Sequence, residues 1–233
     1  AGRDVWELGL CATPAVPLLI REVGAASGLM VSASHNPPAD NGIKVFGADG
    51  TKLSAERQAR VEDGLRGEVE DDGHRRCGRS VQRQDLLRSY QDKLLSSVGD
   101  RRLNGVPIVL DLCWGSATAC AAEVFQTLGA DLTVLHGQPD GERINVACGS
   151  TQLDPLRQAV VAQGAVMGFA FDGDADRMLA VDAQGRVVDG DHVLYLWGSV
   201  LQDQKALPGD RLVATVMSNL GFERAWQDRG GLL

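Results

Sequence analysis

The residues best suited to chemistry form an acidic loop, with Asp172, Asp174 and Asp176 directly after the apolar run at residues 169–171. In an extended backbone, carboxylates at positions i, i+2 and i+4 point to one side. Three carboxylates on one side repel each other unless a cation lies between them, and Mg²⁺ prefers such oxygen ligands. The spacing therefore predicts a magnesium site at this loop.

Three other interpretations of the acidic loop can be compared with the sequence. A solvated acidic turn is the simplest, although the loop follows a buried-type strand. A calcium EF-hand requires glycine at the sixth loop position and glutamate at the twelfth, where this chain has Arg177 and Ala183. A haloacid-dehalogenase-like phosphatase would use Asp172 as its nucleophile, but that interpretation leaves Asp176, Arg177 and a second, serine-containing loop unexplained.

The second loop carries Ser34 at the end of an apolar segment and is stiffened by two prolines. His35 and Lys44 are near in sequence and could shuttle a proton or supply positive charge. A phosphorylated serine carries about −1.5 to −2 charges, which a metal with Arg177 and Lys44 could balance. An ordinary polar loop is the alternative, and Ser32 stays a competing nucleophile because it lies on the same side as Ser34.

The elements expected around these loops alternate between strands and helices. Thr13 as N-cap and Pro14 at the first helical position predict a helix that ends at Gly24. Residues 66–85 read as a linker. The predicted strands are 28–33 (buried), 43–46, 106–112, 131–135, 166–171, 178–182 and 213–217, and the other predicted helices are 55–65, 85–97, 117–128, 155–163, 191–201 and 220–228. This alternation predicts an α/β fold of consecutive α/β/α sandwiches with mixed sheets.

Composition shifts near residues 87 and 189 predict three domains, at residues 1–87, 88–188 and 189–233. We expect the first to hold the serine loop, the second to hold the acidic loop, and the first and third to be truncated. The first residue is Ala1 rather than methionine, which fits a fragment.

Bulk properties exclude several classes of function. The net charge of −8 argues against a nucleic-acid partner, and no apolar run approaches the roughly 20 residues that span a bilayer. Five cysteines without a CxxC pair favour a reducing cytoplasm over a disulfide or zinc framework. His74, His136 and His192 show no partner pattern, so we expect them to be structural or exposed.

The two loops together resemble the α-D-phosphohexomutase superfamily. The segment GLMVSASHNPPADNGIKVFGADGTKL at 28–53 is similar to its phosphoserine loop, and FDGDADR at 171–177 to its metal loop. TPAV at 13–16, VDGDHVLYLW at 188–197 and MSNLGFE at 217–223 also fit. The resemblance covers nearly the whole chain and is weakest between residues 60 and 90.

The resemblance implies a role for each matching residue. Ser34 would be the phosphoserine and, with the three aspartates, a ligand of Mg²⁺. Lys44 would be the general acid/base, His35 and Asn36 would support the serine loop, with Asn36 near phosphate, and Arg177 would contact phosphate. The implied reaction moves phosphate between O6 and O1 of a hexose phosphate through a bisphosphate intermediate.

The segment INVACGST at 144–151 resembles the glucosamine branch of the superfamily, although Gln152 stands where we expect histidine. The implied substrates are glucosamine 6-phosphate and glucosamine 1-phosphate. A phosphomannomutase or phosphoglucomutase of the same superfamily, and a sugar-phosphate-binding module that has lost catalysis, are the alternatives. Because sugar-reading and phosphate-binding loops of later domains are missing, we expect this chain alone to be inactive. A homodimer of the full-length protein is also compatible with the resemblance.

Overall fold

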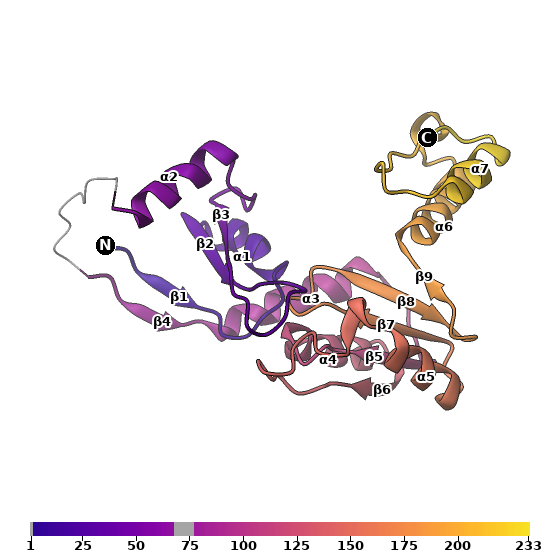
Figure 1. The fold of residues 1–233 in the computed structure, drawn as a ribbon, viewed down its shortest axis with the longest axis horizontal. Coiled ribbons are helices and arrows are strands. Elements are labelled where there is room, and N and C mark those ends of the chain that lie inside the picture. The colour runs from indigo at the N-terminus through magenta and orange to yellow at the C-terminus, as the bar shows by residue number, and fades with distance from the viewer. Residues whose placement is uncertain (1, 68–76) are drawn as a thin grey trace.

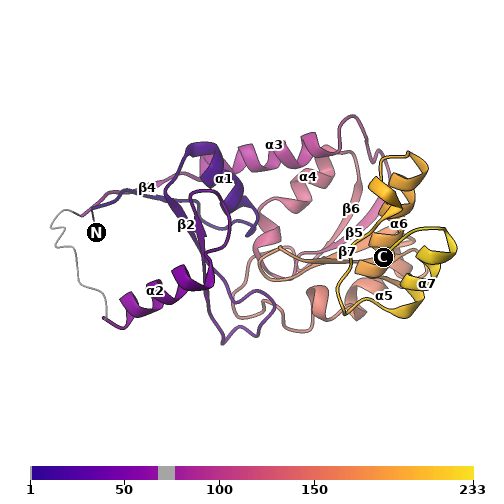
Figure 2. The same ribbon diagram turned by 90° about the horizontal axis from the view of Figure 1, so that it is seen from above.

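The computed structural model describes residues 2–67 and 77–233, and it arranges their elements in three consecutive groups (Figure 1). The first group contains the serine loop and lies against the second, which contains the acidic loop. The third group, near the C-terminus, stands at the opposite end of the molecule from the N-terminus (Figures 1 and 2). The arrangement brings the two candidate loops to the boundary between the first two groups.

The first group contains two small sheets. Its elements are β1 (Val5–Glu7), α1 (Ala15–Val23), β2 (Ser27–Val31), β3 (Ile43–Gly47), α2 (Ala55–Leu65) and β4 (Ser80–Gln82). Strand β1 pairs in parallel with β4, and β2 pairs antiparallel with β3. The serine loop connects β2 to β3, so this antiparallel pair holds both of its ends.

Helix α1 covers one face of the β2–β3 pair. Its apolar residues recur at helical spacing, and Val16 and Ile20 are buried on one side. The helix ends at Gly24, whose φ of 66° is the left-handed conformation that glycine adopts without strain. At Gly28 the helix packs so closely that a Cβ atom would lie 2.6 Å from the Ile20 side chain. The start of β2 is therefore fixed directly against the helix.

The second group is a five-stranded mixed sheet with helices on both faces. Its strands, in spatial order, are β6 (Asp131–Leu135), β5 (Pro107–Asp111), β7 (Met167–Phe171), β8 (Met178–Asp182) and β9 (Val187–Val188). The first three are parallel, and β8 and β9 each run antiparallel to their neighbour. The predicted α/β class and mixed sheet are confirmed.

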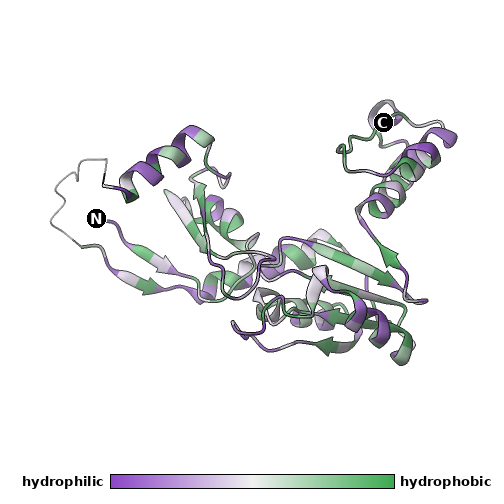
Figure 3. Ribbon diagram, viewed as in Figure 1, coloured by the Kyte–Doolittle hydropathy of each residue, from purple (hydrophilic) through white to green (hydrophobic). Residues whose placement is uncertain are grey.

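Alternate residues of β5 enter two different cores, as the period of a strand requires. Val109 packs with Leu156 and Val160 of α5 (Asp154–Gln163) on one face. Ile108 and Leu110 pack with the segment of α4 (Ala121–Thr127) on the other. Apolar residues accordingly gather on the strands of this sheet (Figure 3). Burying each such side chain stabilises the fold by roughly 1.5–3 kcal/mol, which makes the sheet a firm base for the acidic loop that follows β7.

Helix α3 (Leu87–Ser97), preceded by the 3₁₀ turn η1 (Gln84–Leu86), joins the first two groups. Its buried Tyr90 belongs to the same apolar cluster as Val16 and Ile20 of α1. Ala175 of the acidic loop packs against this cluster too. The two groups thus share a core next to the site.

The third group contains α6 (Gly190–Asp203), the 3₁₀ turn η4 (Pro208–Asp210) and α7 (Leu220–Asp228). Asp189 and Asn219 cap the two helices, each accepting a backbone N–H bond. The predicted strand at 213–217 is wrong, because no strand of the described residues pairs with it and Val213 and Val216 are 86% and 101% exposed. Strand-forming residues do not form a strand without a hydrogen-bonded neighbour.

Three further predictions are corrected. The strand predicted as buried at 28–33 is β2, and Leu29 and Val31 are 65% and 64% exposed because only one face of its two-stranded sheet is covered. The predicted linker at 66–85 contains β4 and η1, while residues 68–76 lie outside the described residues, as does His74. The helix predicted at 117–128 is a 3₁₀ turn, η2 (Ser116–Ala119), followed by α4, because Cys120 leaves helical geometry.

Among the described residues, no helix is both long enough and apolar enough to cross a membrane. All five cysteines are free thiols. Cys11, Cys113 and Cys148 are buried, whereas Cys77 is exposed.

Candidate active site

The serine loop holds Ser34 in a strained and specific geometry. Ser34 is half-buried and has a φ of 56°, a left-handed conformation that costs a residue other than glycine about 1–3 kcal/mol. Its backbone N–H donates to Ser32 Oγ over 2.8 Å. The Ser32 hydroxyl thus accepts a hydrogen bond from the backbone of the loop, while the Ser34 hydroxyl faces the acidic loop. This geometry favours Ser34 over Ser32 as the reacting hydroxyl.

The acidic loop gathers its carboxylates by a turn. Residues 172–177 are not extended, so the predicted extended backbone is wrong: the Ala175 N–H donates to the Asp172 carbonyl over 3.0 Å, and Ala175 has a φ of 55°. The carboxylates nevertheless converge, with ligand oxygens of Asp172, Asp174 and Asp176 all within 4.8 Å of one another. Asp172 and Asp174 are buried and Asp176 is exposed.

The two loops meet. Ser34 Oγ donates to Asp172 Oδ2 over 2.9 Å, across a separation of 138 positions in the sequence. Gly173 lies against the serine loop so closely that a Cβ atom there would be 2.6 Å from the Ser34 carbonyl oxygen. The glycine between the first two aspartates is thus required by the close approach of the two backbones.

Two cationic side chains lie among these groups. The Arg177 guanidinium donates to Ser34 Oγ over 2.6 Å and to Asp172 Oδ2 over 2.9 Å. The Lys44 ammonium donates to Asp174 and, over 2.9 Å, to Asp176. Together they offset most of the negative charge of the three aspartates, and both lie where a phosphate on Ser34 would need positive neighbours.

His35 and Asn36 are exposed, and among the described residues their side chains make no hydrogen bond to the three aspartates of the acidic loop. His35 Nδ1 lies 2.5 Å from Arg177 Nη2 and accepts a hydrogen bond from it. The Asn36 side-chain amide donates to Asp40 Oδ2 over 2.9 Å, within the same loop. The predicted site residues are therefore adjacent, and the roles expected for them stay predictions.

Burial and hydrogen bonds act in opposite directions on the pKa values of the site. Burial raises the pKa of the Asp172 carboxyl, and the hydrogen bonds from Ser34 and the Arg177 backbone only partly offset it. Burial would raise the pKa of Asp174 also, but hydrogen bonds from Lys44 and Thr13 outweigh it and the pKa is lowered. Burial would lower the pKa of Lys44, yet its bonds to Asp174 and Asp176 raise it. The pair at Asp174 and Lys44 is therefore ionised.

The donor set fits a hard divalent cation. Asp174 Oδ1 is buried and, among the described residues, has no hydrogen-bond partner. An unsatisfied buried carboxylate oxygen is costly, and an oxygen-ligated cation between the three carboxylates would satisfy it.

Thr13 is a site residue that sequence reasoning missed. The prediction of Thr13 as a helix N-cap is wrong, because Pro14 occupies the cap position and makes no side-chain bond. Instead Thr13 Oγ1 donates to Asp174 Oδ2 over 2.5 Å, and the Thr13 N–H donates to the Asp174 carbonyl. A threonine before proline reads locally as a cap, and its partner lies 161 positions away. No short-range signal could have found the contact.

Open clefts flank Ser34 on two sides. One, of about 400 Å³, is lined by three cations and one carboxylate together with Ser34 and His35; the charged residues are Lys44, Lys52, Arg177 and Asp176. The other, of about 330 Å³, extends over the serine loop towards Trp114 and Asn145. The cation-lined cleft suits an anionic substrate, and Lys52 is a lining residue that the sequence did not single out.

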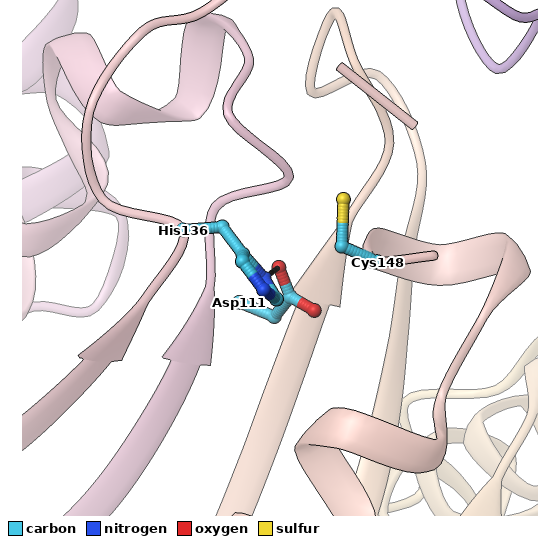
Figure 4. A group of neighbouring side chains, drawn as sticks. All are labelled: Asp111, His136 and Cys148. Carbon is cyan, nitrogen blue, oxygen red and sulfur yellow. Dashed lines mark hydrogen bonds and ion pairs between the residues drawn. The ribbon is translucent and has the colours of Figure 1, made fainter. Parts of the chain in front are cut away.

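A second cluster of polar side chains, formed by Asp111, His136 and Cys148, lies near the site (Figure 4). Asp111, at the end of β5, is fully buried and contacts His136 Nδ1 over 2.8 Å. Its carboxylate also accepts the backbone N–H groups of Cys113 and Gly149. With Cys148 the pair has the spacing of a metal site. The Asp111 oxygens, however, already accept hydrogen bonds from the protein, and the Cys148 thiol contacts Cys113 Sγ and the Arg143 carbonyl, each over 3.9 Å. We interpret the cluster as structural, as expected for His136.

Comparison with known proteins shows the family of the chain. Sequence models of the phosphoglucomutase/phosphomannomutase alpha/beta/alpha domains I, II and III match residues 1–71, 88–185 and 189–233. The chain belongs to the phosphoglucomutase/phosphomannomutase family. It is 97% identical over its whole length to a protein from Parasynechococcus marenigrum that is named phosphoglucosamine mutase, of which it covers 50%. The chain thus spans about half the length of the curated relatives it matches.

Solved structures of the family share the fold. A phosphoglucomutase/phosphomannomutase family protein from Burkholderia thailandensis superposes with a TM-score of 0.78 at 26% identity, covering 99% of this chain and 51% of that one. An N-acetylphosphoglucosamine mutase from Aspergillus fumigatus, solved with GlcNAc-6P and magnesium, gives a TM-score of 0.56 at 19% identity, covering 85% of this chain and 54% of that one. The second likeness shows the fold alone.

Proposed function

We propose that the protein of which this chain is a part is a phosphoglucosamine mutase, which interconverts glucosamine 6-phosphate and glucosamine 1-phosphate. The observation that carries the proposal is the position of Ser34 Oγ, 2.9 Å from Asp172 Oδ2 and 2.6 Å from Arg177 Nη2. The name of the 97% identical relative supports the substrate. The segment 144–151, which resembles the glucosamine branch of the superfamily, supports this substrate as well, and its Asn145 contacts the serine loop.

In the proposed reaction Ser34 enters the cycle as a phosphoserine. The P–O bond to Ser34 Oγ breaks as a new P–O bond forms to the free hydroxyl of the sugar phosphate, which gives a bisphosphate. The other phosphoryl group then returns to Ser34, so no phosphate is consumed. The departing Ser34 oxygen is stabilised by the Arg177 donor, which already contacts it.

Lys44 is the proposed general acid/base: the ammonium held in this structure gives a proton to the departing Ser34 oxygen, and the amine that remains takes the proton of the attacking hydroxyl. Its ammonium is held by Asp174 and Asp176, so the same residue also contributes positive charge. His35 orients Arg177 through their contact of 2.5 Å, and Asn36 stiffens the loop through Asp40.

Magnesium is the proposed cofactor, with Ser34, Asp172, Asp174 and Asp176 as ligands. When bound, it would supply positive charge beside the transferring phosphoryl group. The buried Asp174 Oδ1, which has no hydrogen-bond partner within residues 2–67 and 77–233, supports this choice, as does the magnesium with which the Aspergillus fumigatus enzyme was solved.

We also propose a cytoplasmic location, on the cysteine pattern, and leave a homodimer of the full-length protein as a further proposal. We keep the three proposed domain boundaries, 1–87, 88–188 and 189–233, as those of the intact enzyme's first half.

The test compares glucosamine, glucose and mannose phosphates as substrates of the full-length protein. We expect the highest kcat/KM with glucosamine phosphates and no turnover with Ser34→Ala. A preference for mannose or glucose phosphates would move the protein to the other branch of the family. Activity that survives Ser34→Ala but not Asp172→Asn would indicate a phosphatase instead, and binding without turnover would indicate an inactive module.

A further inference from the structure

Asn145 joins the two halves of the site through a single side chain. Its Nδ2 donates to the backbone oxygens of Ser34, over 2.8 Å, and Asn36, over 2.9 Å. Its Oδ1 accepts from the Gly173 N–H and from the Cys113 thiol, each over 3.1 Å. The side chain amide thus uses both of its donor hydrogens and both of its acceptor sites.

The backbone at Asn145 is built for this contact. Its φ of 61° lies in the left-handed region, where asparagine is one of the few residues tolerated apart from glycine. The buried Asp111 carboxylate accepts from the N–H of Gly149, further along the same loop, and from the N–H of Cys113, in the loop that follows β5. Asn145 is itself half-buried and is held by a fixed support, and a polar network whose members are all hydrogen-bonded rigidifies its surroundings.

We propose that Asn145 is a positioning residue that sets the distance between the Ser34 hydroxyl and the three aspartates. The inference rests on the phosphoryl transfer proposed above and adds to it a residue outside the two recognised motifs. Asn145 contacts only backbone atoms of the serine and acidic loops. Its hold is therefore the same whether Ser34 carries a phosphate or has given it to the sugar.

The experiment uses the full-length protein with Asn145→Asp and Asn145→Gly. Aspartate has nearly the same shape and tolerates the left-handed backbone, but it places an oxygen against the carbonyls of Ser34 and Asn36. Glycine keeps the backbone conformation and removes the amide. The matched control is Asn104→Asp, because Asn104 is exposed and lies on the turn before β5.

We expect both variants to lower kcat about 10- to 100-fold, as misplacement of a reacting group by about 1 Å does. The KM for glucosamine 6-phosphate should stay within about threefold, since a positioning residue acts on the transition state rather than on substrate binding. The melting temperature should stay close to that of the wild type, and Asn104→Asp should behave as wild type throughout.

If the wild-type protein is active as a mutase, either of two results would overturn the inference about Asn145. One is a kcat within about twofold of wild type in both Asn145 variants, which would mean almost no loss of transition-state stabilisation. The other is a loss of activity that only tracks a loss of folded protein. A wild-type full-length protein that interconverts no hexose phosphate would instead overturn the proposed function and, with it, the inference.

Discussion

Replacing Gly173 by alanine tests whether the close approach of the two loops matters for catalysis. The added Cβ would lie 2.6 Å from the Ser34 carbonyl oxygen, 2.8 Å from Asn145 Nδ2 and 2.9 Å from Ile144 Cδ1. Ordinary contacts begin at 3.4 Å, so the serine backbone must retreat by about 0.8 Å. Because the obstacle is backbone rather than the end of a flexible side chain, the shift moves Ser34 itself away from Asp172.

A displacement of this size costs about 100-fold in rate for a reacting group that must be aligned, equivalent to about 2.7 kcal/mol of transition-state stabilisation. The assay is the steady-state interconversion of glucosamine phosphates by the full-length protein, with saturating Mg²⁺. The matched control is Gly190→Ala, at the start of α6, where an added Cβ meets nothing within 4 Å. A Gly173→Ala enzyme with the kcat of the Gly190→Ala control would refute the argument that the backbones must touch.

Three further outcomes are expected. Asp174→Asn should weaken Mg²⁺ binding by about tenfold or more in calorimetry. The control Asp131→Asn, which changes an exposed carboxylate on β6, should leave the affinity unchanged. Equal affinities in the two variants would remove Asp174 from the ligand set. Thr13→Val should lower the free energy of unfolding, measured with urea, by about 1.5–3 kcal/mol, because it removes a hydrogen bond to a buried carboxylate. The control is Thr127→Val, which removes an exposed hydroxyl. Equal losses in the two variants would contradict the prediction. Iodoacetamide at pH 8 should label the exposed Cys77 before the buried Cys11. The reactive form is the thiolate, and burial raises the pKa of the Cys11 thiol to about 11. Equal labelling rates would argue against the buried core around α1.

The sequence predicted those features that depend on local pattern. The helix at 55–65 and the strands at 131–135 and 178–182 match α2, β6 and β8 in full, because each has a clear period and a turn or cap at its ends. The α/β class follows from the alternation of such elements, and the structure confirms it. The proximity of Ser34 to Asp172 was expected from resemblance, since nothing local connects residues 138 positions apart.

The features that sequence reasoning missed depend on partners far along the chain. Thr13 and Asn145 owe their positions to contacts across 161 and 111 positions, and locally they read as a helix cap and as part of a specificity segment. The segment 213–217 has the residues of a strand but no neighbour to pair with among the described residues. Leu29 and Val31 have the residues of a buried strand, yet one face of β2 is uncovered. Propensity gives the preferred local form, and tertiary contacts decide whether that form is realised.

The central claim is that Ser34 carries the phosphoryl group beside the three aspartates. It is tested most directly by mass spectrometry of the full-length protein, with the site of modification assigned by fragmentation. The account predicts a species heavier by about 80 Da, with the phosphate on Ser34, that disappears in Ser34→Ala and exchanges its phosphate with added glucosamine phosphates. Phosphate on Ser32 or Asp172, or a fully active enzyme that never carries phosphate at Ser34, would contradict it.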